Sequence, residues 1–329
     1  MLNSWTITRT KIQVAQPVRV YKGEALASYG FGDPHPFGLD RHDVFHAELA
    51  AAGLGDRIEY ASPVSASVDD LLLFHTADYI DKVSRMSTAG KGFLDGGDTP
   101  AVPGIFDAAS VVVGTTIAAV DSVMRGETRR AFVPIGGLHH AARDGAAGFC
   151  VFNDCGVAAE YLRKQYGLTR IAYVDIDAHH GDGVFYGFED DPDLIFADIH
   201  EDGRHLYPGT GAESETGAGR ARGTKLNVAL APGAGDPEFD RAWSRVESYL
   251  DHARPEFILF QCGADSLEGD PITHLRFTEG AHARAAAALC RIADKHCEGR
   301  VVGTGGGGYN RSNIARAWTR VVQSFADAA

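Results

Sequence analysis

The sequence predicts an α/β fold with a mostly parallel central sheet, helices on both of its faces and an active site at the carboxyl ends of the strands. Short runs rich in Val, Ile, Leu and Phe alternate with longer stretches of helical periodicity through most of the 329 residues, a pattern typical of parallel strands joined by helices. Long glycine-rich loops follow the strands, and open α/β sheets bind their ligands at that end.

The individual elements follow from residue type and periodicity. The predicted strands are Val18–Tyr21, Arg130–Ile135, Arg170–Ile176, Leu194–Ile199, Lys225–Leu230, Phe257–Cys262 and Arg300–Val302. The predicted helices are Arg41–Ala52, Val68–Val83, Gly104–Met124, Val157–Tyr166, Pro237–His252, Glu279–Lys295 and Ser312–Phe325. No repeat and no linker rich in proline or serine divides the chain. We therefore expect one catalytic domain over residues 18–329, preceded by an N-terminal extension over residues 1–17.

Composition narrows the class of partner and the location. A net charge of -13 disfavours nucleic acid, which usually binds to a basic patch. The five cysteines show no regular spacing and are expected to be reduced thiols. We expect no secretory leader and no stretch that approaches the roughly 20 apolar residues needed to cross a bilayer. A cytoplasmic protein that contacts no membrane is the expectation.

Acidic and imidazole side chains crowd the end of the predicted strand Arg170–Ile176. Asp175, Asp177 and His179 alternate along the chain and start out pointing the same way. Such groups repel or desolvate one another unless a cation neutralises them, although a solvated acidic loop is the alternative. Asp265, at the end of another apolar strand, would complete the three ligands of a catalytic Zn²⁺ or Fe²⁺ site, whereas alone it would be an ordinary cap or turn residue.

Two further loops carry candidate catalytic groups. His139 and His140 are adjacent and follow a predicted strand, which favours a functional over a structural role. The segment Gly303–Asn310 satisfies the dinucleotide pattern GxGxxG, but no second strand and acidic residue follow it as that site requires. We interpret its glycines as a close approach of the backbone to the metal that delivers Tyr309, whose phenol can donate a hydrogen bond to an oxyanion.

These residues resemble the histone deacetylase superfamily, which includes acetylpolyamine amidohydrolases and bacterial acetoin-utilisation deacetylases. The resemblance runs from about Val18 to Ser324. The motifs that carry it are Gly137–Ala141, Gly148–Asp154, Asp175–Gly183, Tyr207–Gly211, Gly263–Asp265, Gly269–Pro271 and Gly305–Asn310. The segments 135–140 and 177–182 look closest to the acetoin-utilisation branch. The resemblance implies a single-domain fold of the arginase/deacetylase type.

The resemblance also implies a catalytic apparatus. The implied ligands of Zn²⁺ are Asp177, His179 and Asp265. His140 would take the proton of the attacking water and pass one to the leaving amine, with His139 as a second imidazole beside the water. Asp175 would support His139 and Asp182 would support His140, since a carboxylate partner fixes the tautomer and raises basicity. Tyr309 would stabilise the oxyanion.

The implied substrate contacts are less specific. The residues that match the walls of the family's acyl-lysine tunnel are Gly148, Phe149, Tyr207 and Ile272. Plain core packing is the alternative for them. Asp98 matches a rim aspartate that grips the substrate backbone in relatives acting on peptides, and a turn residue is the alternative. Arg41 matches an arginine of an internal channel through which product leaves, and a surface helix residue is the alternative.

One position departs from many relatives. Asp198 stands where they place a serine, on a monovalent-cation site shared with Asp175, Asp177 and His179. An added carboxylate would strengthen the binding of a cation, or would demand a proton without one. We expect K⁺ or Na⁺ at this site.

The expected function is zinc-dependent hydrolysis of N-acyl amides such as acetyl-lysine. Acetylpolyamine or small-metabolite amide hydrolysis is the alternative, followed by a ureohydrolase with two metal ions and by a noncatalytic sensor of acyl ligands. The sequence leaves the substrate and the oligomeric state open, since a fold is shared by many functions.

Overall fold

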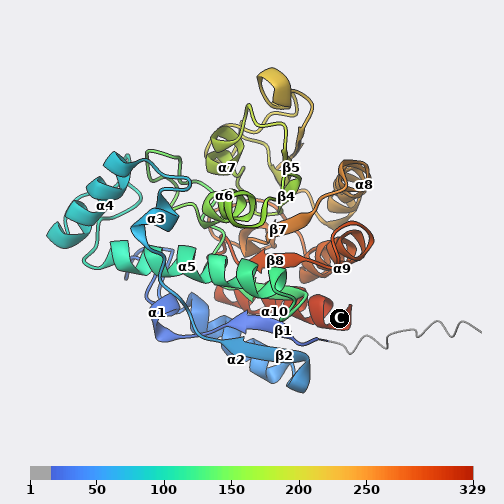
Figure 1. Cartoon of the computed structure of the whole chain (residues 1–329), viewed down its shortest axis with the longest axis horizontal. Helices are drawn as coiled ribbons and strands as arrows, with labels where there is room; N and C mark the ends of the chain where they lie inside the picture. Colours follow the sequence, from blue (N-terminus) through green and yellow to red (C-terminus); the bar gives the residue numbers. More distant parts are fainter. Residues whose placement is uncertain (1–15, 329) are drawn as a thin grey trace, which may run out of the picture.

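A single parallel sheet organises the chain (Figure 1). The structure is a computed structural model that describes residues 16–328, so most of the predicted extension, residues 1–15, lies outside the described residues. The described strands form an eight-stranded sheet in the order β2-β1-β3-β8-β7-β4-β5-β6, with every pairing parallel. The strands are β1 (Val18–Tyr21), β2 (Ile58–Ala61), β3 (Arg130–Val133), β4 (Ile171–Asp175), β5 (Leu194–Glu201), β6 (Lys225–Leu230), β7 (Phe257–Gln261) and β8 (Val301–Thr304).

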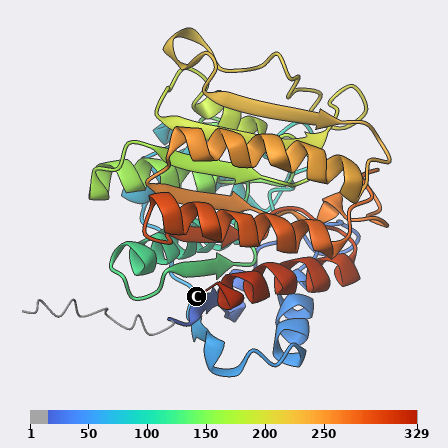
Figure 2. The same ribbon diagram turned by 90° about the vertical axis from the view of Figure 1, so that its right-hand side faces the viewer.

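Helices cover both faces of this sheet. The α-helices are α1 (Glu24–Ala27), α2 (Arg41–Ala51), α3 (Val68–Leu71), α4 (Ala77–Ala89), α5 (Ile105–Met124), α6 (Asp154–Tyr166), α7 (Asp182–Gly187), α8 (Asp236–Ala253), α9 (Glu279–His296) and α10 (Arg311–Asp327). Helices α3 to α7 pack on one face, whereas α2, α8, α9 and α10 pack on the other. Figure 2 shows α8 to α10 in front of the sheet, with their axes roughly along the strands, which all run in one direction.

Strand β4 explains why two separate cores form. Its side chains alternate, so Ile171 and Tyr173 enter one core while Ala172 and Val174 enter the other. All four are buried, as expected of a central strand with helices on both sides. The predicted α/β class and the parallel sheet are confirmed.

Two element predictions were wrong in part. The predicted helix Val68–Val83 is broken into α3 and α4. The break is stabilised by tertiary contacts, because Thr76 N–H donates to the carbonyl of Arg143 at 2.8 Å and His75 Nε2 accepts from Asn153 N–H at 2.9 Å. Strand β2 was not predicted, because its Glu59 and Tyr60 side chains are exposed at the edge of the sheet.

Helix α5 corrects the expectation about apolar stretches. By length and composition it could cross a membrane, with a mean hydropathy of 1.4 over its best window. That window is 72% buried inside the protein, and the helix packs on α6 and β3. We therefore interpret α5 as a core helix.

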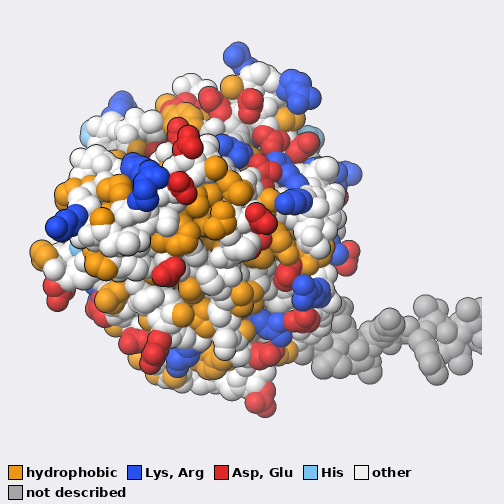
Figure 3. Space-filling model, turned by 60° about the vertical axis from the view of Figure 1, so that its left-hand side comes forward, with side chains coloured by type: hydrophobic (Ala, Val, Ile, Leu, Met, Phe, Trp, Pro, Cys, Tyr) orange, Lys and Arg blue, Asp and Glu red, His pale blue; other side chains and the backbone are white. Residues whose placement is uncertain are grey.

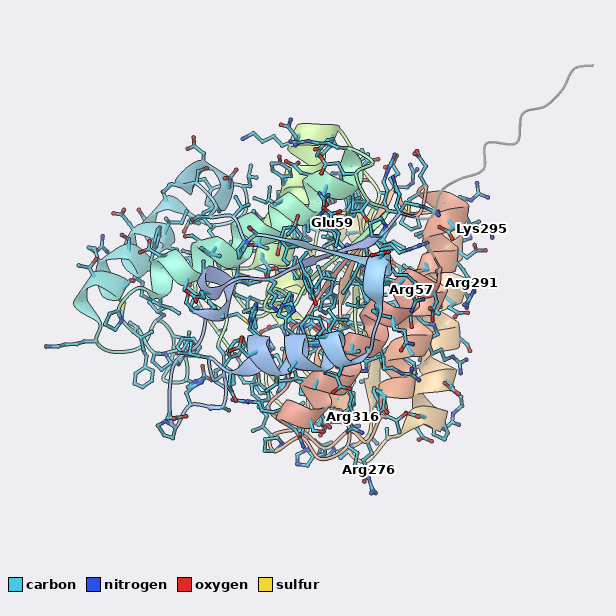
Figure 4. All side chains as sticks on the ribbon, turned by 90° about the horizontal axis from the view of Figure 1, so that it is seen from below. Arg57, Glu59, Arg276, Arg291, Lys295 and Arg316 are labelled. Carbon is cyan, nitrogen blue, oxygen red and sulfur yellow. The ribbon has the colours of Figure 1, made fainter. Side chains whose placement is uncertain are left out.

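Charged side chains line the exterior. On α9, Arg291 lies 3.5 Å from Glu247 and Lys295 lies 2.5 Å from Asp251 of α8, and Figure 4 shows both basic residues on the outer side of the helix. Exposed pairs of this kind contribute little to stability. On the face drawn in Figure 3, acidic and basic side chains are scattered among hydrophobic ones, without a continuous basic patch.

Replacing Trp318 with Ala should lower the free energy of unfolding by about 3–5 kcal/mol, because a large aromatic side chain leaves a cavity. Trp318 is fully buried, packs edge-on against Phe45 and donates from Nε1 to the carbonyl of Cys262 at 3.2 Å. Urea denaturation measures the loss. Arg320→Ala, on the exposed side of the same helix, should stay within about 0.5 kcal/mol of wild type. Equal losses in both variants would contradict this role of Trp318.

Candidate active site

Three buried side chains meet where β4 and β7 end. These strands are neighbours, with Asp175 opposite Gln261 in the parallel register. The loop after β4 carries Asp177 and His179, and the short 3-10 helix η3 (Ala264–Ser266) after β7 carries Asp265. One ligand atom from each of these three residues lies within 4.8 Å of the other two. The structure thus brings together the predicted metal ligands.

The chemistry of this group fits a divalent metal ion. Asp177 and Asp265 are both fully buried. Among the described residues, no hydrogen bond reaches Oδ2 of Asp265, which lies 3.2 Å from Nδ1 of His179. Burial and the charge of Asp177 raise the pKa of Asp265 to about 7. A cation would satisfy the unpaired oxygen and offset the repulsion, and an oxygen/nitrogen donor set suits Zn²⁺ or Fe²⁺.

The other carboxylate oxygens are held by N–H donors. Oδ2 of Asp177 accepts from the Gln261 amide and from Gly307 N–H, each at 2.8 Å. Oδ1 of Asp265 accepts from Ala178 N–H at 2.9 Å. Gln261 was missed by the sequence analysis, although it is the last residue of the strand that leads to Asp265. Its contact with Asp177 holds that ligand in place.

Two glycines let the backbone approach the carboxylates. A Cβ atom on Gly263 would lie 2.1 Å from Oδ2 of Asp177, and one on Gly307 would lie 2.0 Å from Oδ2 of Asp265. Both distances are far below van der Waals contact. This close approach agrees with the interpretation of the glycine-rich segment as a metal-site loop.

Each histidine of the adjacent pair has its own carboxylate. Nδ1 of His139 lies 2.7 Å from Oδ2 of Asp175, and Nδ1 of His140 lies 2.7 Å from Oδ1 of Asp182. The two Nε2 atoms lie 3.1 Å apart. Tyr173 also donates its hydroxyl to Oδ2 of Asp175. The structure therefore brings these four site residues into the pairs that the resemblance implies, while their catalytic roles stay predictions.

Burial and neighbouring charges shift the pKa values of the two imidazoles in opposite directions. Burial acts to lower the pKa of His139, but the charges of Asp175 and Asp177 outweigh it and raise that pKa to about 10. Burial and the neighbouring charge of His139 lower the pKa of His140 to about 4. Two adjacent rings thus favour different protonation states, with His140 as the neutral one.

The glycine-rich loop after β8 delivers Tyr309 and rests on Arg41. Arg41 is fully buried and donates to the carbonyls of Gly306 at 2.6 Å and Gly308 at 3.0 Å, so it is not a surface residue. Its guanidinium lies 3.9 Å from the ring centre of Phe37, which lines an inner cavity with Tyr309. Burial and the charge of Asp265 raise the pKa of Tyr309 well above its ordinary value, so the phenol keeps its proton. The channel role of Arg41 stays a prediction.

A pocket of about 230 Å³ opens above the metal ligands. All of the predicted substrate contacts line it, and they are Asp98, Gly148, Phe149, Tyr207 and Ile272. His140, His179 and Tyr309 also line it, and the same three residues line the small inner cavity together with Asp177. The predicted wall residues therefore face a cavity, although Phe149 also packs against the hydrophobic core, and their contact with substrate stays a prediction.

At the rim, Asp95 rather than Asp98 stabilises the turn. Oδ1 of Asp95 accepts from the N–H groups of Gly97, Asp98 and Thr99 at 2.9 to 3.1 Å. Asp98 instead lines the pocket. Burial and the nearby Asp95 raise the pKa of Asp98 to about 6.

Asp198 lies opposite Asp175 in the register of β4 and β5. Its Oδ2 accepts from Gly181 N–H at 2.8 Å, and its Oδ1 lies 2.8 Å from Nδ1 of His200. Nε2 of His200 lies 2.9 Å from the carbonyl of Gly211. Both ring nitrogens of His200 face acceptors, and although burial acts to lower its pKa, the charge of Asp198 outweighs burial and raises the pKa above its ordinary value. The K⁺ or Na⁺ site stays a prediction.

Comparison with known proteins gives one family. The model of the histone deacetylase domain matches residues 35–325. Acetoin utilization protein AcuC of Bacillus subtilis (strain 168) is 38% identical over 307 residues, covering 89% of this chain and 78% of the relative. Histone deacetylase clr6 of Schizosaccharomyces pombe is 31% identical over 311 residues, covering 92% of this chain and 75% of the relative.

A solved structure agrees in fold. The crystal structure of the HDA15 HD domain superposes with a TM-score of 0.88 at 27% sequence identity, covering 95% of this chain and 88% of that chain. The family match spans the strand ends that carry the candidate metal ligands, the histidine pair and Tyr309. The chain therefore belongs to the histone deacetylase family, and it is a hydrolytic deacetylase.

Proposed function

We propose that this deacetylase hydrolyses N-acyl amides, with acetyl-lysine in a peptide or protein, or a small acylated amine, as substrate. The observation that carries the proposal is the position of the candidate metal ligands at the base of a pocket, beside a histidine pair and a phenol. A water-activating site, a base and an oxyanion donor around one cavity are what amide hydrolysis requires.

We assign Zn²⁺, with Fe²⁺ as the alternative, to Asp177, His179 and Asp265. When bound, such an ion polarises the acyl carbonyl and lowers the pKa of a water molecule. The unpaired Oδ2 of Asp265 and the N–H donors that hold the other oxygens support this assignment.

We assign the proton transfers and the stabilisation of charge to three side chains of the protein. His140, fixed at Nδ1 by Asp182, takes the proton of the attacking water and returns one to the leaving amine. His139, fixed by Asp175, stands beside it and stabilises negative charge near the water. Tyr309 donates its phenolic proton in a hydrogen bond to the developing oxyanion.

The pocket selects the rest of the substrate. Phe149 and Tyr207 line it, and we assign them to clasp the alkyl chain of the amine. Asp98 at the rim would accept from the substrate's backbone N–H or attract a cationic amine. A peptide, a polyamine or a small metabolite satisfies this description, and the cytoplasmic location also stays a prediction.

Two other functions fit less well. A ureohydrolase needs two bridged metal ions, whereas residues 16–328 contain one group of three candidate ligands. A noncatalytic sensor has no need of the carboxylate-supported His140 or of Tyr309 in the same pocket.

Chelation should abolish the release of acetate from an acetyl-lysine peptide, and added Zn²⁺ should restore it. The reason is that the proposed reaction needs a bound metal ion to polarise the acyl carbonyl and to lower the pKa of the attacking water. Acetate release and metal content per chain are measured together, over peptide, polyamine and small-amide substrates. Metal-loaded protein that is inactive on every substrate would overturn the proposal and favour the sensor.

Replacing Tyr309 with Phe should lower kcat by about 10²- to 10³-fold, the cost of one lost oxyanion donor. Metal content should not change, because Tyr309 is not among the candidate ligands. Steady-state kinetics and metal analysis check both points. Tyr60→Phe, at a residue 45% exposed on the edge strand, should behave as wild type, and an unchanged kcat in the Tyr309 variant would remove the phenol from the mechanism.

Replacing Gly307 with Ala should weaken Zn²⁺ affinity by about 10- to 100-fold, as the loss of support for a ligand does. The new methyl group would displace the Asp265 carboxylate. Competition with a coloured chelator measures the affinity. Gly145→Ala is the matched control, because a Cβ there meets no atom within 4 Å. Equal affinities for the two variants would argue against Asp265 as a ligand.

A further inference from the structure

His180 follows the candidate ligand His179 but has no part in the proposed mechanism. Its ring is 1% exposed, and Nδ1 lies 2.8 Å from the hydroxyl of Thr210. No hydrogen bond reaches Nε2 from the residues that the structure describes. The bond to Thr210 is therefore the polar contact that fixes this imidazole.

Thr210 closes the base of the loop that follows β5. The loop leaves the strand near Gly203 and returns at Thr210. A Cβ on Gly203 would lie 2.5 Å from the carbonyl oxygen of Thr210, so the two ends of the loop are in direct contact. His180 thus binds the closed end of the loop to the segment that carries His179.

Tyr207 lies within this loop and forms a wall of the pocket. Its ring centre is 5.2 Å from that of His140, in an edge-to-face arrangement. The residue is nevertheless 45% exposed, and its ring is packed only on the side of His140 and His179. Two backbone connections position it: Leu206 N–H donates to the carbonyl of Asp202 at 3.3 Å on one side, and on the other side two residues join Tyr207 to Thr210.

The segment after Thr210 has separate anchors. The carbonyl of Gly211 lies 2.9 Å from Nε2 of His200, and Gly211 N–H donates to Oε1 of Glu215 at 2.9 Å. Oε2 of Glu215 in turn accepts from the hydroxyl of Tyr186 at 2.8 Å. Loss of the Thr210 hydroxyl would release the Tyr207 loop without detaching this segment.

We propose that His180 and Thr210 are positioning residues that set the width of the substrate pocket by holding the Tyr207 loop against the metal-ligand loop. The proposal rests on the proposed function in taking this pocket as the site of the acylated amine. It goes beyond that function in assigning substrate affinity to a pair of residues that touch neither substrate nor metal.

Thr210→Val removes the hydroxyl and keeps the shape. KM for an acetyl-lysine peptide should rise roughly three- to tenfold, the effect of one lost hydrogen bond, while kcat and metal content stay as in wild type. Thr210→Ser retains the hydroxyl and should restore KM. Thr216→Val is the matched control, because the hydroxyl of Thr216 is similarly half-buried but has no hydrogen bond to the described residues.

A second measurement does not depend on catalytic activity. The protein is labelled with 3-fluorotyrosine, and the ¹⁹F resonance of Tyr207 is assigned by its loss in the Tyr207→Phe variant. In wild type the ¹⁹F line of Tyr207 should be narrow, and Thr210→Val or His180→Ala should shift or broaden it. An unchanged KM with an unchanged line would overturn the proposal, as would a fall in kcat accompanied by loss of metal. Inactive wild-type protein would refute the proposed function alone, since the ¹⁹F line would still decide whether His180 and Thr210 position the wall.

Discussion

The burial of two carboxylates, Asp177 and Asp265, side by side is the constraint on which the rest of the site depends. Negative charge removed from water must be met by donors or by a cation. N–H groups meet both oxygens of Asp177 and Oδ1 of Asp265, which leaves Oδ2 of Asp265 without a hydrogen-bond donor among the described residues. These donors come from loops after β4 and β8, and Gln261 comes from the end of β7. The central order β8-β7-β4 is therefore a requirement of the site as well as of the fold.

The same burial shifts the pKa values of two neighbouring histidines in opposite directions. His139 faces the carboxylates of the metal site, so its charged form is favoured. His140 has the single carboxylate of Asp182 and stands beside His139, so its neutral form is favoured. A divalent cation on Asp177 would weaken the attraction that raises the pKa of His139. Metal binding and the protonation of the pair are thus linked through one carboxylate.

The sequence was sufficient for the parts of the structure that local pattern determines. The bounds of β1 and β6 agree with the prediction, because both strands are short apolar or alternating runs followed by turns. Asp177 and Asp265 could be placed together because parallel strands end at one edge of a sheet. The break before Thr76 could not be predicted, since its stabilising partners, Arg143 and Asn153, lie in a distant loop.

The same limit explains which site residues were missed. The role of a glutamine at a strand end, or of a second histidine in a motif, can be recognised only from the residue that it contacts in the structure. For Gln261 that partner is Asp177, and for His180 it is Thr210, 30 residues away along the chain. His179 and His180 are adjacent, yet one faces the metal ligands and the other faces the loop of Tyr207. One short segment holds both histidines, so it connects the Tyr207 loop directly to the metal ligand His179. The spacing of residues in the sequence does not reveal this connection.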